Sequence, residues 1–262
     1  MKVVLEDLSV KEIDSFIKDN LEEIIIDPKN FIKSLINDPR KSVNKLGFSL
    51  EKEIKKRQDE FIRVKKLYDF DKAFNKIVCG VDEVGRGPLA GPIVSAAVIL
   101  KTNSLDSDLI LGLNDSKKIS KKNREKLDKI IKKRALDFSI YEISNKDIDR
   151  YGISQCNNEA FKGAIRNLTL KPDLVLSDGY RVKGYPGENI AIVKGDYKSA
   201  SIAAASIIAK VYRDNLMEEY GKNHKEYGFE TNSGYGSKEH ISAIKKYGKL
   251  EIHRESFIKN II

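Results

Sequence analysis

The sequence has few cysteines and no long apolar run. Two of its 262 residues are cysteine, Cys79 and Cys156, and neither forms a CxxC pair or has a histidine nearby in the sequence. A disulfide framework and a zinc site therefore find no support, and a reducing, cytoplasmic compartment is expected. No stretch of 18 apolar residues occurs, and acidic residues interrupt the N-terminal segment where a signal peptide would be apolar. Membrane insertion and export are not expected.

The composition is that of a globular protein with a basic surface. Hydrophobic residues make up 40% of the chain, enough for a core, and the formal net charge is +9. Residues 1–72 carry 16 basic and 15 acidic side chains, whereas residues 73–262 carry 32 and 24. Nearly all the excess thus lies in the second part. It indicates either a polyanionic partner such as nucleic acid or a lysine-rich solvated surface, and charge alone does not separate the two.

The first 72 residues are predicted to form a small helical extension. Ser9 followed by Glu12 matches a capping box, and apolar residues recur at helical spacing over residues 10–26. Pro28 and Pro39 interrupt the pattern, and Ser49 is expected to open a longer helix with alternating charges. The pattern does not show what this extension does.

Residues 73–262 are predicted to form a mixed α/β domain. The segments that read as strands are 76–84, 92–100, 137–144, 173–181 and 191–198, the second being the hairpin partner of the first. Helices are expected after Ser120, between residues 148 and 170, and over the alanine-rich segment 201–221. Because strands and helices do not alternate regularly, we expect a mixed sheet with helices on its faces.

Acidic residues stand within or directly after these apolar strands. Asp82 and Glu83 are adjacent in the first strand, Asp178 ends another, and Asp196 follows a third. Such carboxylates are costly unless a positive charge neutralises them. Successive strand residues point to opposite faces, so Asp82 and Glu83 can share one site only at a distorted or terminal strand position.

Four convergent carboxylates would suit hard divalent cations. Mg²⁺ and Mn²⁺ prefer oxygen ligands, and two such ions about 4 Å apart are a common arrangement for in-line attack on a phosphodiester. The alternative is that each acid caps a helix or forms a surface salt bridge. Their joint placement favours the metal site.

The glycine-rich segment 85–91 does not match the known nucleotide-binding loops. Its third glycine comes one position too late for a dinucleotide fingerprint, and Pro88 and Pro92 lead into a strand instead of a helix. A Walker A loop would need Gly-Lys-Ser/Thr. The loop is better interpreted as a backbone surface that a sugar or phosphate can approach closely.

Several ordered motifs together resemble the ribonuclease HII family, the type 2 ribonucleases H. They are GVDEVGRGPLAGPIVSAAVIL (80–100), LNDSKKIS (113–120), SDGY (177–180), VKGDYKSASIAAASIIAKVYRD (193–214), GYGS (234–237) and HRESF (253–257). The resemblance covers roughly residues 73–262, and the N-terminal helices resemble an extension found in some members from Gram-positive bacteria. It implies a ribonuclease H-like α/β fold.

The resemblance also implies an activity and a site. Members are metal-dependent endonucleases that cut RNA in RNA–DNA hybrids and 5′ of single ribonucleotides in duplex DNA, leaving 3′-hydroxyl and 5′-phosphate ends with two Mn²⁺ or Mg²⁺ ions. The family's carboxylates fall on Asp82, Glu83, Asp178 and Asp196. Gly85, Arg86, Gly87 and Tyr235 match the sensor of the ribose 2′-hydroxyl, in which glycine backbone groups bond the hydroxyl and the tyrosine stacks on a sugar.

Other candidate residues carry weaker signals. Lys117, Lys118 and Lys198 are candidate phosphate contacts, although a solvated face explains them nearly as well, and Ser206 is a further candidate amid small packing residues. Asp214 is interpreted as a salt-bridge or capping residue. A metal-free ribonuclease would need histidine as acid and base, and the three histidines, His224, His240 and His253, are read as solvated or core residues, with a supporting role open for His253.

Two alternatives remain. One is the HIII type of the same superfamily, which is disfavoured because its loop usually carries lysine where this chain has Arg86. The other is a protein that binds RNA–DNA hybrids without cutting them, with structural acids. The presence of all four acids disfavours it.

Overall fold

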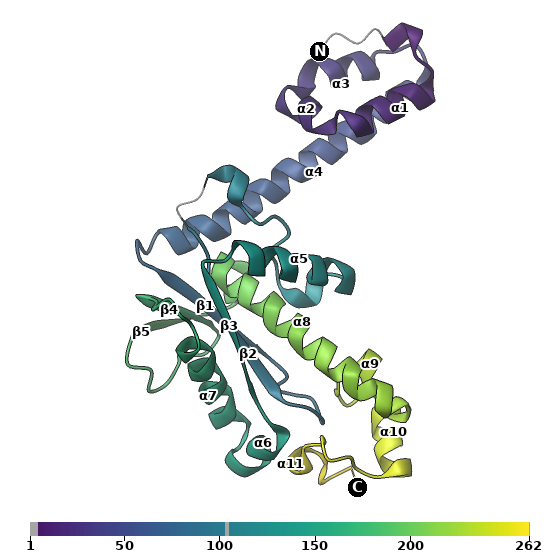
Figure 1. Cartoon of the computed structure of the whole chain (residues 1–262). Coiled ribbons are helices and arrows are strands. Elements are labelled where there is room, and N and C mark those ends of the chain that lie inside the picture. The colour runs from purple at the N-terminus through teal and green to yellow at the C-terminus, as the bar shows by residue number, and fades with distance from the viewer. Residues whose placement is uncertain (1–4, 103–104, 262) are drawn as a thin grey trace. The chain divides into compact units, whose positions relative to one another are not determined.

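The computed structural model describes residues 5–102 and 105–261 (Figure 1). It divides into two compact units, Met1–Arg63 and Val64–Ile262. The division falls inside a helix, α4 (Lys41–Lys72), and lies N-terminal to the predicted boundary at residue 72. The last turns of α4 are therefore part of the second unit.

The first unit is helical, as expected. It contains a 3₁₀ turn (Leu5–Asp7), α1 (Val10–Asp19), α2 (Leu21–Ile26), α3 (Pro28–Ile36) and the first part of α4. The capping box is confirmed: Ser9 Oγ accepts from the Glu12 amide at 3.3 Å, and Glu12 Oε2 accepts from the Ser9 amide at 2.8 Å. Ile13, Leu35 and Val43 are fully buried in the unit's own apolar cluster.

The helix boundaries in this unit differ from the prediction in two places. The segment 10–26 is two helices instead of one, because Asn20 ends α1 by donating its amide and its side chain to the Phe16 carbonyl. α4 begins at Lys41 instead of after Ser49. The helix restarts directly after Pro39, and the apolar spacing that buries Val43 and Leu50 already continues through this region.

The second unit is built on one mixed five-stranded sheet. Its strands are β1 (Val78–Val84), β2 (Ile93–Ile99), β3 (Asp137–Ile143), β4 (Leu174–Asp178) and β5 (Glu188–Ile192), in the order β3-β2-β1-β4-β5. β1 pairs antiparallel with β2, and β2 with β3, while β4 runs parallel to both β1 and β5. The expected α/β fold and the β1–β2 hairpin are confirmed.

The last predicted strand, 191–198, was displaced: β5 spans Glu188–Ile192, so the prediction overlaps it only at residues 191 and 192. β5 ends at Ile192, because Lys194 adopts a left-handed conformation with φ 55° and the chain then turns into a 3₁₀ helix, Gly195–Tyr197. Asp196 therefore lies on a short turn beyond the sheet. The helices of this unit are α5 (Lys121–Arg134), α6 (Asn145–Tyr151), α7 (Ile153–Arg166), α8 (Ala200–Asn223), α9 (Phe229–Asn232), α10 (Lys238–Tyr247) and α11 (Glu255–Ile258). Short 3₁₀ turns include Ser116–Lys118 and Lys225–Tyr227.

Helices α7 and α8 cover opposite faces of the sheet. Cys79 and Val81 of β1 pack in one cluster with Phe161 of α7, whereas Val78 packs in another with Ile202 of α8. Figure 1 shows α8 running along the sheet. The close approach of α8 requires Gly80, because a Cβ there would lie 2.1 Å from the backbone carbon of Ser201. The small residues of α8 thus serve packing.

The N-terminal end of α8 is held by α4. Asp71, fully buried near the end of α4, accepts a hydrogen bond from the Ser201 amide at 2.8 Å. A carboxylate suits this place because the first amides of a helix have no partner within it. Within residues 5–102 and 105–261, no helix is long and apolar enough to cross a membrane.

Candidate active site

Two of the predicted acids lie side by side at the ends of parallel strands. In the β1–β4 register Val81 pairs with Ser177, so the next residues are Asp82 and Asp178. Strand alternation places both on the face covered by α8, in step with Val78. The parallel arrangement of β1 and β4 thus brings together two residues almost 100 positions apart in the sequence.

Asp82 is enclosed between the sheet and α8. It is 8% exposed, and its Oδ1 accepts a hydrogen bond from the Glu83 amide at 2.8 Å. Ser206 of α8 also hydrogen-bonds to the Asp82 carboxylate and lies 3.1 Å from the Ser116 hydroxyl. Ser206, predicted as a substrate contact, is thus a buried residue that supports Asp82 in this structure.

Glu83 lies near the end of its strand, as expected if it is to share a site with Asp82. It is the last but one residue of β1, beyond the pairing with β4, and the chain turns at Gly85 with φ 92°. Its Oε1 lies 3.8 Å from an Arg86 guanidinium nitrogen. Its Oε2 is buried and accepts no hydrogen bond. An unpartnered buried carboxylate oxygen is costly, which is expected where a ligand is to bind.

Asp196 reaches the same edge of the sheet from the 3₁₀ turn after β5. The amide of its neighbour Gly195 donates to Asp178 Oδ1 at 2.6 Å, which fixes this turn against the end of β4. A side chain at Gly195 would leave only 3.3 Å between its Cβ and that oxygen. All four predicted carboxylates are therefore gathered at one edge of the sheet.

Burial and mutual repulsion raise the pKa of three of these acids. The pKa of Asp82 lies well above its ordinary value because the carboxylate is buried and because Glu83 and Asp178 are close. Burial, opposed by Arg86, raises the pKa of Glu83 to about 7. Burial and the charge of Asp178 raise the pKa of Asp196 to about 6. Such a set of acids holds its negative charge poorly unless a cation joins it.

The acids fit a divalent cation by donor chemistry, but the side chains are not arranged as a finished cage. In the described part of the chain, no three histidine, cysteine, aspartate or glutamate side chains are gathered closely enough to hold a metal ion as they stand. The free Glu83 oxygen and the repulsion among Asp82, Asp178 and Asp196 nevertheless favour a hard cation that takes oxygen ligands. Ion binding would have to turn these side chains towards one another.

Two buried arginines hold the glycine-rich loop next to the acids. Arg254 donates to the carbonyls of Gly85, Arg86 and Gly91 at 2.6, 2.9 and 2.9 Å. Arg213 of α8 likewise donates to three carbonyls, those of Ala90, Pro92 and Ser233, at 2.8–3.0 Å. Both arginines are fully buried. Burial lowers the pKa of both, that of Arg254 to about 9.

Tyr235 lies beside this loop and is 40% exposed. A Cβ on Gly87 would be 3.9 Å from its ring, and the Gly234 carbonyl accepts from the Leu89 and Ala90 amides at 2.8 and 3.3 Å. The Arg86 guanidinium carbon lies 4.6 Å from the centre of the Tyr180 ring. The loop and Tyr235, both predicted to contact substrate, are thus brought together.

The predicted lysines flank the acids to different degrees. Lys117 is close enough to the acids to lower the pKa of Glu83 and Asp196. Lys118 Nζ lies 4.7 Å over the Tyr197 ring. Lys198 is exposed at the end of the 3₁₀ turn that carries Asp196.

Asp214 forms ion pairs instead of joining the acids. Its carboxylate lies 2.7 Å from Lys210 Nζ and 3.2 Å from an Arg124 nitrogen, and it accepts from the Ser233 hydroxyl at 3.2 Å. The salt-bridge interpretation is therefore confirmed.

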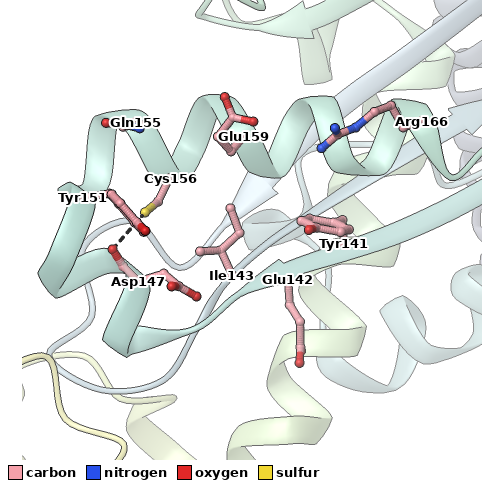
Figure 2. Close-up of a pocket in the computed structure, with 9 residues that line it drawn as sticks. All are labelled: Tyr141, Glu142, Ile143, Asp147, Tyr151, Gln155, Cys156, Glu159 and Arg166. Carbon is pink, nitrogen blue, oxygen red and sulfur yellow. Dashed lines mark hydrogen bonds between the residues drawn. The ribbon is translucent and has the colours of Figure 1, made fainter.

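A separate pocket lies between β3, α6 and α7 (Figure 2). None of the predicted site residues lines it. Asp147 and Glu159 line it together with Arg166, whereas the Glu142 side chain points away and accepts a hydrogen bond from the Tyr212 hydroxyl of α8 at 3.2 Å. Cys156 Sγ lies 3.4 Å from the Asp147 carbonyl. This excess of acids does not suit a phosphate backbone, so the pocket is not a candidate nucleic-acid site.

Sequence reasoning missed the roles of Arg213 and Arg254. Both stand in motifs that carry the family resemblance, VYRD and HRESF, but an arginine in a basic chain gives no sign that it is buried. The glycine-rich loop itself could have indicated that buried donors exist, because the carbonyls of an irregular loop need hydrogen-bond donors from elsewhere in the chain.

Comparisons with known proteins identify the family of the chain. The family model described as ribonuclease HII matches residues 79–260, and the ribonuclease HII N-terminal domain matches residues 10–75. Ribonuclease HII from Clostridium acetobutylicum is 58% identical over 97% of this chain and 100% of its own length. The crystal structure of ribonuclease H2 from Pyrococcus horikoshii matches 70% of this chain and 96% of that one, with 30% identity and a TM-score of 0.61.

A second solved structure, the PCNA:RNase HII complex from Archaeoglobus fulgidus, matches 70% of this chain and 96% of that one, with 26% identity and a TM-score of 0.59. The likeness to relatives named ribonuclease HII over nearly the whole chain resolves the choice between the HII and HIII types. The family model and the relatives, which match over nearly the whole chain, show that it belongs to the ribonuclease HII family of RNase H endonucleases.

Proposed function

We propose that this enzyme hydrolyses the RNA strand of RNA–DNA hybrids and cuts 5′ of single ribonucleotides in duplex DNA, leaving 3′-hydroxyl and 5′-phosphate ends. The observation that carries the proposal is the joint placement of Asp82, Glu83, Asp178 and Asp196 at one edge of the sheet, beside a glycine loop. A binding protein without activity would have no use for a buried, mutually repelling set of acids.

The four acids are proposed to hold divalent cations, Mg²⁺ or Mn²⁺. Such ions would supply positive charge for the developing phosphorane oxygens and would activate the attacking water. Asp82 and Asp178 would bind from the strand ends, and Asp196 from the adjoining turn. Ser206 hydrogen-bonds to the Asp82 carboxylate, and the exposed Lys117 adds positive charge near Glu83 and Asp196.

Substrate recognition is proposed to come from the loop and Tyr235. Backbone groups of Gly85, Arg86 and Gly87 would bond the ribose 2′-hydroxyl, which is the feature that distinguishes RNA from DNA. The partly exposed Tyr235 ring would stack on the adjoining sugar. Lys117, Lys118 and Lys198 would contact phosphates of the backbone, and the cytoplasm is the proposed location.

The direct test is to incubate the protein with Mg²⁺ or Mn²⁺ and a DNA duplex that contains one ribonucleotide. We expect one incision on the 5′ side of the ribonucleotide. Asp82→Asn should lose this activity, while Asp128→Asn, which changes a buried acid of α5 that pairs with Lys132, should keep it. Absence of incision by the wild type, or full activity of Asp82→Asn, would exclude the proposal.

Tyr235→Ala provides a second test, directed at recognition. Loss of the stacking ring should lower kcat/KM on the single-ribonucleotide duplex by about tenfold or more, since base or sugar stacking contributes about 1–3 kcal/mol. A continuous hybrid should lose less, because it offers many alternative registers. Equal losses on the two substrates would contradict the assignment of Tyr235 to the junction.

The domain division at residue 72 remains a proposal, as does a role for the N-terminal helices in substrate binding. Affinity for a hybrid, measured against salt concentration with and without the N-terminal unit, would test that role, because each phosphate contact contributes to the salt slope. An unchanged affinity and slope would assign the helices to something other than substrate binding.

A further inference from the structure

His240 and His253 form a buried chain of hydrogen bonds that ends on Tyr235. His240 Nδ1 lies 2.8 Å from the Tyr235 carbonyl oxygen, and His240 Nε2 lies 3.1 Å from His253 Nε2. At the other end, the Leu250 amide donates to His253 Nδ1 at 2.8 Å. Three links therefore connect the backbone at Leu250 to the backbone at Tyr235.

Only one arrangement of protons satisfies all three links. A carbonyl only accepts, so His240 carries its proton on Nδ1 and accepts at Nε2. A backbone amide only donates, so His253 accepts at Nδ1 and carries its proton on Nε2, which points at His240. Both rings are therefore neutral, and each has one donor and one acceptor in use. The longer contact of 3.3 Å from His253 Nδ1 to the Leu250 carbonyl is not needed.

The apolar surroundings of the two histidines indicate that they do more than fill space in the core. His240 is fully buried and His253 is 1% exposed, and both rings pack against Tyr227 and Phe229. An apolar residue would fill this space without a desolvation cost. A hydrogen-bonded pair of flat rings, by contrast, fixes both the distance and the direction of the peptide it holds.

The residue after His253 holds the other half of the recognition site. Arg254 donates to the carbonyls of Gly85 and Arg86, and its own amide donates to the Leu89 carbonyl at 2.8 Å. His253 and Arg254 are thus consecutive residues, one of which reaches the Tyr235 segment and the other the glycine loop. Their peptide backbone therefore links the two, in addition to the bonds from the Leu89 and Ala90 amides to the Gly234 carbonyl.

We propose that His253, acting through His240, is a positioning residue that holds Tyr235 at a fixed distance from the Gly85–Gly87 loop, and that it thereby determines selectivity for an isolated ribonucleotide. The inference rests on the proposed function. An isolated ribonucleotide presents one 2′-hydroxyl and one junction, so the loop and the tyrosine must engage it together. A continuous hybrid can shift along the site, so its cleavage should depend less on the distance between Tyr235 and the loop.

The test is a double-mutant cycle between His253→Leu and Tyr235→Ala. The measured quantity is kcat/KM on a duplex with one ribonucleotide and on a continuous hybrid. In the wild-type background, His253→Leu should lower the single-ribonucleotide value by about tenfold and the hybrid value by much less. In the Tyr235→Ala background it should change the single-ribonucleotide value by less than about twofold, because the residue it acts through is already gone.

A merely structural role gives a different pattern. In that case His253→Leu would lower kcat/KM on both substrates by the same factor, and it would lower them by that same factor in the Tyr235→Ala background. Either result would overturn the inference. If the wild type cuts neither substrate, the proposed function itself fails, so the two failures are distinguishable.

Two further variants keep the test decisive if His253→Leu does not fold. His253→Gln retains an N–H donor towards His240 and should keep most of the selectivity. His240→Asn retains a donor towards Tyr235 but loses the link to His253, so it should lose selectivity. His224→Gln, a half-buried histidine outside the chain of bonds, is the matched control and should match the wild type. Loss of selectivity in His253→Gln together with its retention in His240→Asn would overturn the assignment.

Discussion

The acid edge and the glycine loop adjoin each other but are built in opposite ways. At the acid edge, carboxylates repel one another and one oxygen of Glu83 has no hydrogen-bond partner. In and around the loop, Arg213 and Arg254 satisfy six carbonyls between them, including that of Ser233, two residues before Tyr235. The difference teaches that the acid edge holds charges without partners in the protein, where we propose that a cation binds, whereas the carbonyls of the loop already have their donors.

The largest expected effect comes from Asp82→Asn. We expect incision to fall by roughly 10³-fold or more, because the variant loses a charge that the acid edge needs in the transition state. The melting temperature without added metal should be unchanged or higher, because Asn keeps the acceptor for the Glu83 amide and removes repulsion. Calorimetry beside the cleavage assay checks this. A marked loss of stability would show that the acid edge is not strained.

Arg213→Leu should have the opposite profile. It leaves the carbonyls of Ala90, Pro92 and Ser233 without their buried donors, and the free energy of unfolding should fall by about 3 kcal/mol. Denaturant titration measures this. Arg150→Leu, at an exposed position of α6, is the control and should change stability by less than about 0.5 kcal/mol. Similar stabilities for both variants would mean that the loop does not depend on Arg213.

Adding Mg²⁺ or Mn²⁺ should stabilise the wild type, since a cation relieves the repulsion at the acid edge. At 100 times the dissociation constant the gain is about 2.7 kcal/mol, or several degrees in melting temperature for a chain of this size. EDTA should reverse the shift. Asp82→Asn should show a smaller shift, and an equal shift in that variant would place the ion elsewhere.

The smallest expected effect is a dependence on pH that comes from the histidine pair. Burial, together with the nearby His240 and His224, lowers the pKa of His253 from 6.5 to about 4, and burial also lowers that of His240. Below pH 6.5 the unfolded chain binds protons at these two histidines that the folded chain does not, so their contribution to stability should fall as the pH drops from 6.5 towards 4. The raised pKa values of Glu83 and Asp196 act in the opposite direction over the same range, so the histidine contribution is measured as a difference: His253→Gln should lose less melting temperature on acidification than the wild type.

Much of this arrangement could be predicted from the sequence, for local reasons. Glycine and proline punctuation and strand periodicity located β1, β2 and β4, and four acids in apolar surroundings predicted a common site. The end of β5 was missed because the left-handed Lys194 has no sequence signal comparable to a glycine. The start of α4 was missed because Ser49 looks like a cap, although a serine is equally tolerated within a helix.

The long-range contacts could not be read in this way. That Arg254 reaches Gly85, or that His240 meets His253, depends on how the C-terminal helices fold back on the sheet. A single sequence shows which groups need partners but not which distant residue supplies them. The distinction between Ser206 as a substrate contact and as a support for Asp82 likewise needed the position of α8.

Helix α8 contacts both halves of the site and so fixes their spacing. Ser206 supports Asp82, and Arg213, seven residues later and therefore two turns along on the same side, holds the loop. The N-terminal end of this helix is held by the hydrogen bond from the Ser201 amide to Asp71. At a rise of 1.5 Å per residue, Ser206 and Arg213 are roughly 10 Å apart along the helix axis. A one-residue insertion between them would rotate one support by about 100° relative to the other. Neither half would lose a residue, yet the acids proposed to cleave and the loop proposed to recognise the ribose would no longer face the same nucleotide.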